Sequence, residues 1–222
     1  MSGAARSDKG ESVADEIPTM EHRRDPRFTL LIRAAKLIAP NGEYMCILRD
    51  ASASGLRAQI FHSLPEHRDF TLELPNGDRH RIELVWERDG HAGFRFADRV
   101  EPAQLIGDPG PFPKRPVRLA VQLPVLITSQ GITMGAVIRN LSQTGARIEC
   151  ETHLAIDQAL RLEAAQLPAI QARVRWRSGN DYGVVLDQTF RFEELARLVG
   201  TLQQGTAGDA AAAGRFEGVN FA

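Results

Sequence analysis

The chain contains one long internal repeat, in which a segment of its first half returns 90 positions later. The matching pairs are Arg49/Arg139, Asp50/Asn140, Ser52/Ser142, Gly55/Gly145, Trp86/Trp176 and Gly93/Gly183. Arrays with a short period need three or more units to bury a core, whereas a single long repeat is typical of a duplicated domain. The sequence therefore predicts two similar small domains in tandem.

Each copy has the pattern of a β domain. Ile82, Leu84 and Trp86 recur at every second position, as on one face of a half-buried strand, which would place Trp86 in the core. Asn76-Gly77 between two such runs is a strong hairpin signal. About six short antiparallel strands per copy favour a small closed barrel, because closure leaves no unpaired edge. By the same pattern, Trp176 is expected in the core of the second copy.

Composition changes along the chain predict where the domains begin and end. Residues 101–113 contain the run Asp108-Pro109-Gly110-Pro111-Phe112-Pro113, which favours an extended linker. Apolar residues at three- and four-residue spacing predict a C-terminal helix over residues 190–203, with a weaker counterpart at 102–106. The expected organisation is a disordered tail (1–20), domain one (21–100), a linker (101–111), domain two (112–203) and a disordered tail (204–222).

Charge and cysteine content exclude several classes of protein. With 27 Lys and Arg against 28 Asp and Glu, the chain lacks the basic excess of a protein that holds duplex nucleic acid. No apolar run approaches the roughly 20 residues of a membrane helix or resembles a signal peptide. Cys46 and Cys150 lie outside any metal-ligand spacing, so both are expected to be reduced, buried thiols. We therefore expect a cytoplasmic protein without a transmembrane segment, a metal or a cofactor.

Two polar motifs stand out in each copy. The first is a basic cluster before the first expected strand, formed by Arg23, Arg24 and Arg27 in copy one and by Lys114, Arg115 and Arg118 in copy two. The second is D/N-x-S-x-x-G, formed by Asp50, Ser52 and Gly55 in copy one and by Asn140, Ser142 and Gly145 in copy two. Taken singly, these motifs indicate a solvated basic arm and a turn whose glycine tolerates positive φ.

In combination, the motifs resemble those of the PilZ domain, a bacterial receptor for cyclic di-GMP. That family is marked by R-x-x-x-R followed by D/N-x-S-x-x-G, and copy one matches both through Arg23, Arg27 and the turn at Asp50. Copy two has Lys114 where the first arginine stands, while Arg118 matches the second. The resemblance covers about 165 of the 222 residues. It implies two six-stranded β-barrels, a C-terminal α-helix on the second, and no catalysis.

The resemblance also implies a role for each motif residue. Arg23 and Arg27 would clamp guanine and phosphate, because a guanidinium forks onto oxygens and stacks on purines. Asp50 would accept hydrogen bonds from the guanine edge, Ser52 would orient the turn or contact the ligand, and Gly55 would let the chain turn closely beneath it. The corresponding set in domain two is Lys114, Arg115, Arg118, Asn140, Ser142 and Gly145. Binding would order the arginine-rich arms and alter the domain arrangement or the surface offered to a protein partner.

Three other functions are weighed against this one. A PilZ-fold interaction adaptor with one or both nucleotide sites inactive is suggested by Lys114, which keeps a charge but lacks the planar fork of arginine. A binder of single-stranded nucleic acid would use the arginine clusters and exposed aromatic residues, but the near-neutral net charge disfavours it. An enzyme is disfavoured because no nucleophile, base and orienting group occur together in a known motif.

Overall fold

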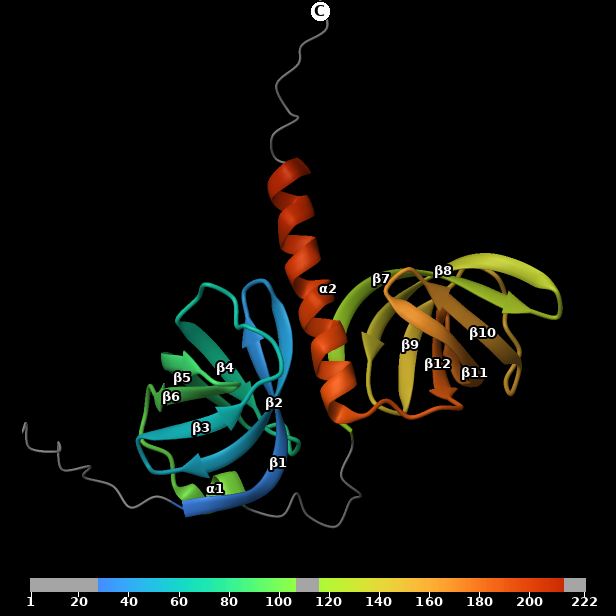
Figure 1. Ribbon diagram of the computed structural model, residues 1–222. Helices are drawn as coiled ribbons and strands as arrows, with labels where there is room; N and C mark the ends of the chain where they lie inside the picture. Colours follow the sequence, from blue (N-terminus) through green and yellow to red (C-terminus); the bar gives the residue numbers. More distant parts are fainter. Residues whose placement is uncertain (1–27, 107–115, 214–222) are drawn as a thin grey trace, which may run out of the picture.

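The first half of the chain folds into a closed barrel of six antiparallel strands, seen at the left of Figure 1. The computed structural model describes residues 28–106 and 116–213. Around barrel one the strands follow the order β1-β2-β3-β6-β5-β4. Their bounds are β1 Phe28–Ala39, β2 Gly42–Ala51, β3 Gly55–Gln59, β4 Asp69–Glu73, β5 Arg79–Arg88 and β6 His91–Phe96.

The second half repeats this architecture, which confirms the tandem barrels expected from the repeat. Barrel two is closed in the order β10-β11-β12-β9-β8-β7, the same order of pairing as in barrel one. Its strands are β7 Leu119–Ser129, β8 Ile132–Leu141, β9 Gly145–Glu149, β10 Ala159–Ala164, β11 Leu167–Ser178 and β12 Asp181–Leu186. Equal pairing order in both halves is what duplication of one domain produces.

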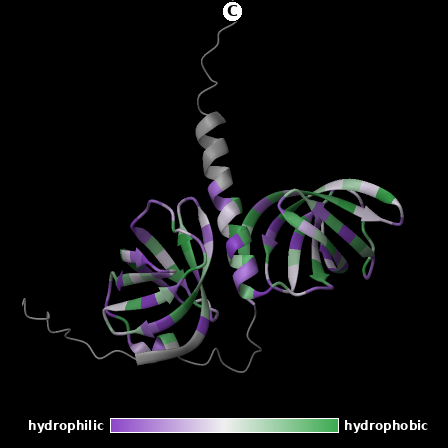
Figure 2. Cartoon of the chain, in the orientation of Figure 1, coloured by the Kyte–Doolittle hydropathy of each residue, from purple (hydrophilic) through white to green (hydrophobic). Residues whose placement is uncertain are grey.

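Alternating side chains fill the barrel interiors. Along β7, every second residue from Leu119 to Ile127 is buried, and the residues between them are exposed. Figure 2 shows the same alternation as purple and green bands along the strands of both barrels. Cys46 and Cys150 are buried as free thiols. In barrel one the predicted Asn76-Gly77 hairpin joins β4 to β5, with Gly77 at φ +92°.

Two helices complete the fold. Helix α1 (Pro102–Ile106) lies in the segment expected to be linker, yet Leu105 is fully buried in barrel one, and Arg33 donates a hydrogen bond to its carbonyl at 2.7 Å. Helix α2 (Phe192–Ala213) forms where a helix is expected but continues ten residues beyond Gln203, into the expected tail. The four alanines at 210–213 favour this extension, because alanine has the highest helix propensity. The expected tail at 1–20 and the remaining linker at 107–111 lie outside the described residues.

Helix α2 follows barrel two in sequence but packs between the two barrels (Figure 1). Phe192 meets Phe61 of barrel one edge-on, with ring centroids 5.6 Å apart. A Cβ on Gly200 would come within 2.6 Å of the His62 ring, so the helix contacts barrel one closely at this point. Met45 of β2 joins the apolar core cluster of barrel two. Neither helix in the described ranges has the length and hydropathy needed to cross a membrane.

Candidate functional site

The D/N-x-S-x-x-G motif forms the turn from β2 to β3 in barrel one and from β8 to β9 in barrel two. Ser52 donates from its backbone N–H to the carbonyl of Gly55 at 2.8 Å and from its hydroxyl to the same oxygen at 3.3 Å. Ser142 makes both bonds to Gly145 at 2.9 Å. Both serines are buried. The serine therefore holds the turn in shape in both copies.

The glycine of the motif is required by close packing and not by positive φ. Neither Gly55 nor Gly145 is among the residues with positive φ, which corrects the explanation based on the turn alone. A Cβ on Gly55 would lie 2.6 Å from the carbonyl oxygen of Phe94, and one on Gly145 would lie 2.6 Å from that of Val184. The neighbouring strand thus approaches too closely for any side chain at this position.

The first motif residue begins a row of side chains across four strands of barrel one. Asp50 is in register with Arg57, Arg57 with Gly93, and Gly93 with Trp86. Register partners point to the same side of a sheet, so these residues share one face. Arg57 Nε lies 2.6 Å from Asp50 Oδ2, and their side chains are 43% and 17% exposed. The row presents a carboxylate, a guanidinium and an indole side by side at the surface.

Barrel two repeats the row with one chemical difference. Asn140, Arg147, Gly183 and Trp176 occupy the corresponding register positions. The neutral amide of Asn140 forms no ion pair with the arginine. Arg147 instead lies 3.8 Å from Asp181 Oδ1, and its buried Nε atom has no hydrogen-bond partner among the described residues. The guanidinium of barrel two is therefore held less firmly than its counterpart in barrel one.

The tryptophans lie on the outer face, so the prediction that they belong to the core is wrong. Trp176 is 41% exposed and Trp86 is half-buried. A register shift between Leu84 and Trp86, and another between Val174 and Trp176, marks a β-bulge. A bulge inserts one extra residue and moves the following side chain to the other face. Each indole then lies directly on the glycine opposite, where a Cβ would collide with its ring nitrogen.

The basic arms are only partly within the described residues. Arg23, Arg27, Lys114 and Arg115 lie outside them. Arg118 is exposed and immediately precedes β7, whose residue Ala120 is in register with Asn140. In barrel one, Thr29 of β1 is in register with Asp50. In both copies, the strand that follows the basic motif therefore starts beside the first residue of the D/N-x-S-x-x-G turn.

Arg57 and Arg147 are site residues that were not predicted from the sequence motifs. Each stands two positions after the motif glycine, and the two are related by the same 90-residue spacing as the motif itself. That recurrence was an available signal. Their place beside Asp50 and Asn140, however, follows from strand register.

A cleft of about 430 Å³ lies apart from these rows, between barrel one and α2. Its lining includes Phe61, His62, Glu87, His91 and Arg197. Burial lowers the pKa of His62, against the opposing effects of its bond to the Ser63 carbonyl and the charge of Glu87. Within residues 28–106 and 116–213, no three His, Cys, Asp or Glu side chains are grouped as a metal site requires. The cleft therefore offers a mixed polar lining without a metal-ligand set.

The chain matches the model of one protein family and is similar to several solved structures. The PilZ domain model matches residues 21–107 and again 114–202. Borreliella burgdorferi PlzA in complex with c-di-GMP is 11% identical, with 80% of this chain and 93% of that chain covered and a TM-score of 0.32. The K. pneumonia MrkH–c-di-GMP complex is 13% identical (82% and 90% covered, TM-score 0.29). The Bacillus subtilis inhibitor of motility MotI/DgrA is 15% identical (83% and 99%, 0.31). No curated protein matches the chain.

Proposed function

Since the chain belongs to the PilZ domain family and carries the domain twice, we propose that it is a non-enzymatic receptor for cyclic di-GMP. In this proposal each barrel offers a nucleotide site on its outer face, at the D/N-x-S-x-x-G turn. The receptor acts in the cytoplasm. Ligand binding orders the arginine-rich arms and changes the surface that the protein offers to a partner.

The observation that carries the proposal is the row of Asp50, Arg57, Gly93 and Trp86 on one face of barrel one. Guanine presents N–H donors on one edge, O6 and N7 acceptors on another, and a flat aromatic face. A carboxylate accepts from the first edge, a guanidinium donates to the second, and an indole stacks on the face. Stacking a base on an aromatic side chain is worth about 1–3 kcal/mol. The row therefore matches guanine group by group.

Each motif residue has a separate role within this site. Arg23 and Arg27 bind phosphate and guanine from the arm, and Asp50 accepts from the guanine N1–H and amino group. Ser52 holds the turn in shape, a role supported by its two hydrogen bonds to the carbonyl of Gly55. Gly55 allows β6 to approach the turn.

The ion pair between Arg57 and Asp50 has a consequence for binding. At 2.6 Å, Arg57 already occupies one oxygen of the carboxylate that guanine is expected to use. Cyclic di-GMP must therefore share Asp50 with Arg57 or displace it. A displaced guanidinium remains within reach of phosphate or guanine O6 and N7, so the interaction lost at Asp50 is regained at the ligand.

The proposed site of barrel two uses Lys114, Arg115, Arg118, Asn140, Ser142 and Gly145, with Arg147 and Trp176 beside them. Asn140 supplies a neutral amide where Asp50 supplies a charge, and hydrogen bonds to charged groups are about twice as strong as neutral ones. Lys114 lacks the planar fork of arginine. We therefore propose that barrel two binds cyclic di-GMP more weakly than barrel one.

Isothermal titration with cyclic di-GMP tests the proposal. The wild-type chain should show two binding events for cyclic di-GMP, one of high affinity and one weaker. Asp50→Ala, and separately Arg23→Ala with Arg27→Ala, should remove the first, while Asn140→Ala should remove the second. Arg68→Ala is the matched control, because Arg68 is exposed and pairs only loosely with Glu83, at 3.5 Å. Absence of binding heat in wild type, or unchanged binding in the arm variant, contradicts the proposal.

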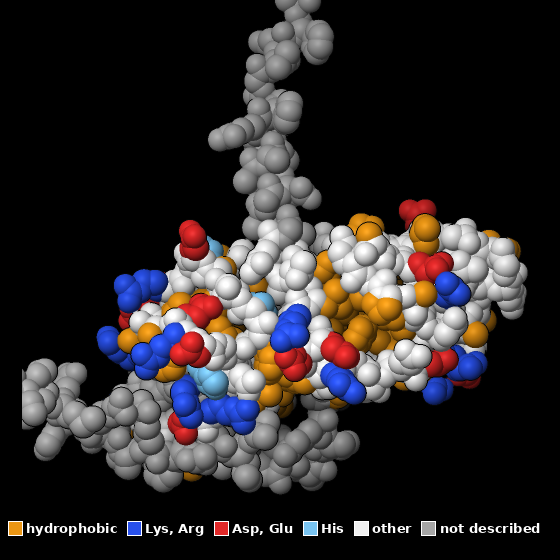
Figure 3. Space-filling model, viewed as in Figure 1, with side chains coloured by type: hydrophobic (Ala, Val, Ile, Leu, Met, Phe, Trp, Pro, Cys, Tyr) orange, Lys and Arg blue, Asp and Glu red, His pale blue; other side chains and the backbone are white. Residues whose placement is uncertain are grey.

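A second candidate is an interaction adaptor whose barrel two has kept the fold without the nucleotide site. The loosely held Arg147 and the neutral Asn140 favour it for that barrel. Basic and acidic side chains are interspersed on the face of the molecule drawn in Figure 3. This face therefore has no continuous basic stripe of the kind that binds nucleic acid. The charge pattern does not distinguish the receptor from the adaptor. An affinity for a protein partner that is equal with and without cyclic di-GMP would favour the adaptor.

A further inference from the structure

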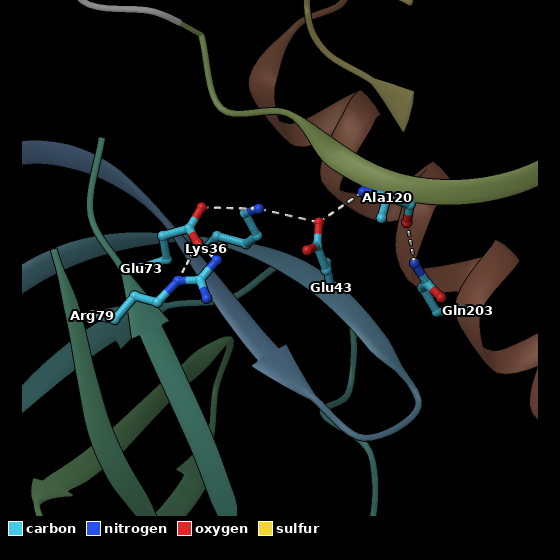
Figure 4. Close-up of polar contacts among 6 residues, drawn as sticks. All are labelled: Lys36, Glu43, Glu73, Arg79, Ala120 and Gln203. Atoms are coloured by element: carbon cyan, nitrogen blue, oxygen red, sulfur yellow. Dashed lines mark hydrogen bonds and ion pairs between the residues drawn. The ribbon is translucent and has the colours of Figure 1, made fainter. Parts of the chain in front are cut away.

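One residue of barrel two is held by groups from two other parts of the chain. The backbone N–H of Ala120, near the start of β7, donates to Glu43 Oε2 of barrel one at 2.7 Å. The carbonyl oxygen of the same residue accepts from Gln203 Nε2 of α2 at 2.8 Å. Figure 4 shows both contacts, and we refer to Glu43, Ala120 and Gln203 together as the clamp.

The clamp lies directly beside the proposed nucleotide site of barrel two. Ala120 is the register partner of Asn140. In a strand, the N–H and C=O of one residue point to the same edge, so those of Ala120 point toward the clamp and away from β8. Ala120 and Asn140 therefore form a non-hydrogen-bonded pair, the closer kind, with Cα atoms about 4.5 Å apart. Arg118 precedes Ala120 by two positions and shares its face.

Further interactions hold Glu43 and Gln203 in place. Lys36 Nζ lies 3.2 Å from Glu43 and 3.0 Å from Glu73, and Glu73 pairs in turn with Arg79 at 2.6 Å (Figure 4). All but Arg79 are mostly buried, so screening by solvent is reduced. The Gln203 side chain lies against Gly42, where a Cβ would collide with it. Barrel one thus supports the clamp from both sides, holding Glu43 through Lys36 and packing Gly42 against Gln203.

We propose that Glu43 of barrel one is a positioning residue for the nucleotide site of barrel two, an inference that rests on the proposed function of that site. By fixing Ala120, Glu43 fixes the start of the strand that pairs with Asn140 and follows Arg118. A site whose parts are already ordered loses less conformational entropy on binding and has a higher affinity. Barrel two therefore needs barrel one for full affinity.

This coupling acts in both directions. If Glu43 strengthens binding at barrel two, ligand at barrel two strengthens the clamp by the same factor. Occupation of the second site then tightens the contact between the barrels. The affinity of the weaker site therefore depends on the relative position of the two domains.

The test uses the full chain carrying Asp50→Ala, so that cyclic di-GMP titrates only barrel two. Adding Glu43→Ala should weaken binding about fivefold or more, the lower range of coupling between sites. Glu43→Gln keeps an acceptor oxygen and should restore most of the affinity. Gly42→Ala disturbs the clamp from the Gln203 side and should also weaken binding. Glu83→Ala, a glutamate of barrel one outside the clamp with ion pairs to Arg68 and Arg95, is the control and should change nothing.

Hydrogen exchange of residues 119–123 gives a second readout without ligand. Glu43→Ala should accelerate exchange there, and cyclic di-GMP should slow it in the Glu43-intact protein. The inference is overturned if the Glu43→Ala variant binds cyclic di-GMP at barrel two with wild-type affinity. It is also overturned if barrel one binds the nucleotide and barrel two does not. The proposed function survives both results for barrel one. Absence of binding by the unmodified chain instead refutes the proposed function itself.

Discussion

Gly145 should be far less tolerant of a side chain than Gly135, although both are strand glycines of barrel two. A Cβ at Gly145 would lie 2.6 Å from the backbone oxygen of Val184, whereas one at Gly135 would have no atom within 4 Å. Overpacking costs about 1–3 kcal/mol. Replacing glycine by alanine also removes unfolded-state entropy, which gains about 0.4–1 kcal/mol. Gly145→Ala should therefore destabilise barrel two by about 1–2 kcal/mol, and Gly135→Ala should stabilise it slightly.

The two tryptophans allow barrel two to be followed separately. In a Trp86→Phe background, Trp176 is the remaining tryptophan of the chain, so its fluorescence in urea reports the unfolding of barrel two. With an m-value of about 2 kcal/mol/M, the midpoints of the Gly145→Ala and Gly135→Ala variants should differ by roughly 1 M. Equal midpoints would refute the reasoning that close approach of β12 explains the motif glycine.

Burial and ion pairing change the titration of Cys46, Glu73 and His62 in ways that can be measured. Burial raises the pKa of the Cys46 thiol to about 12, so a thiol reagent at pH 8 should modify it only after unfolding. Burial raises the pKa of Glu73, but hydrogen bonds and charges from Lys36 and Arg79 lower it more, so its net pKa lies below 4.5. Its stabilising effect should hold above pH 4.5 and be lost as the pH falls through the folded-state value; Glu73→Gln should flatten this part of a urea-midpoint profile. Burial lowers the pKa of His62, so stability should decline as the pH falls below 6.5, and His62→Phe should remove that decline. An unchanged pH profile in either variant would contradict the assignment.

Most of the fold could be predicted from the sequence because its signals are local. Strand alternation, the Asn76-Gly77 turn and the helical spacing after residue 190 depend on neighbours a few positions apart, and each is present in the structure. The 90-residue repeat then supported the same fold for both halves of the chain. The error over Trp86 and Trp176 arose where the two-residue period fails, since a β-bulge leaves no mark in composition.

The two halves of the molecule also show why the candidate site was only partly predictable. The motif residues were identified from their order along the chain, and their turn is held by bonds within four residues. Arg57 and Arg147 were missed because their relation to the motif runs across strands. Arg57 pairs with Asp50, whereas Arg147 has the neutral Asn140 at the corresponding position and lies near Asp181. This difference between the barrels is visible only once the ion pairs are known.

Residue order alone predicted two barrels, their strands and the turn that marks each proposed site, since strand alternation, turn motifs and the 90-residue repeat can be recognised without knowing which distant strands pair to close each barrel. Three-dimensional packing decided the rest: that the indoles face outward, that α2 lies between the barrels, and that Glu43 and Gln203 meet at Ala120. Such contacts join residues 77 and 83 positions apart. They have no periodic or compositional signature, because they exist only where two barrels and a helix from distant parts of the chain are packed together.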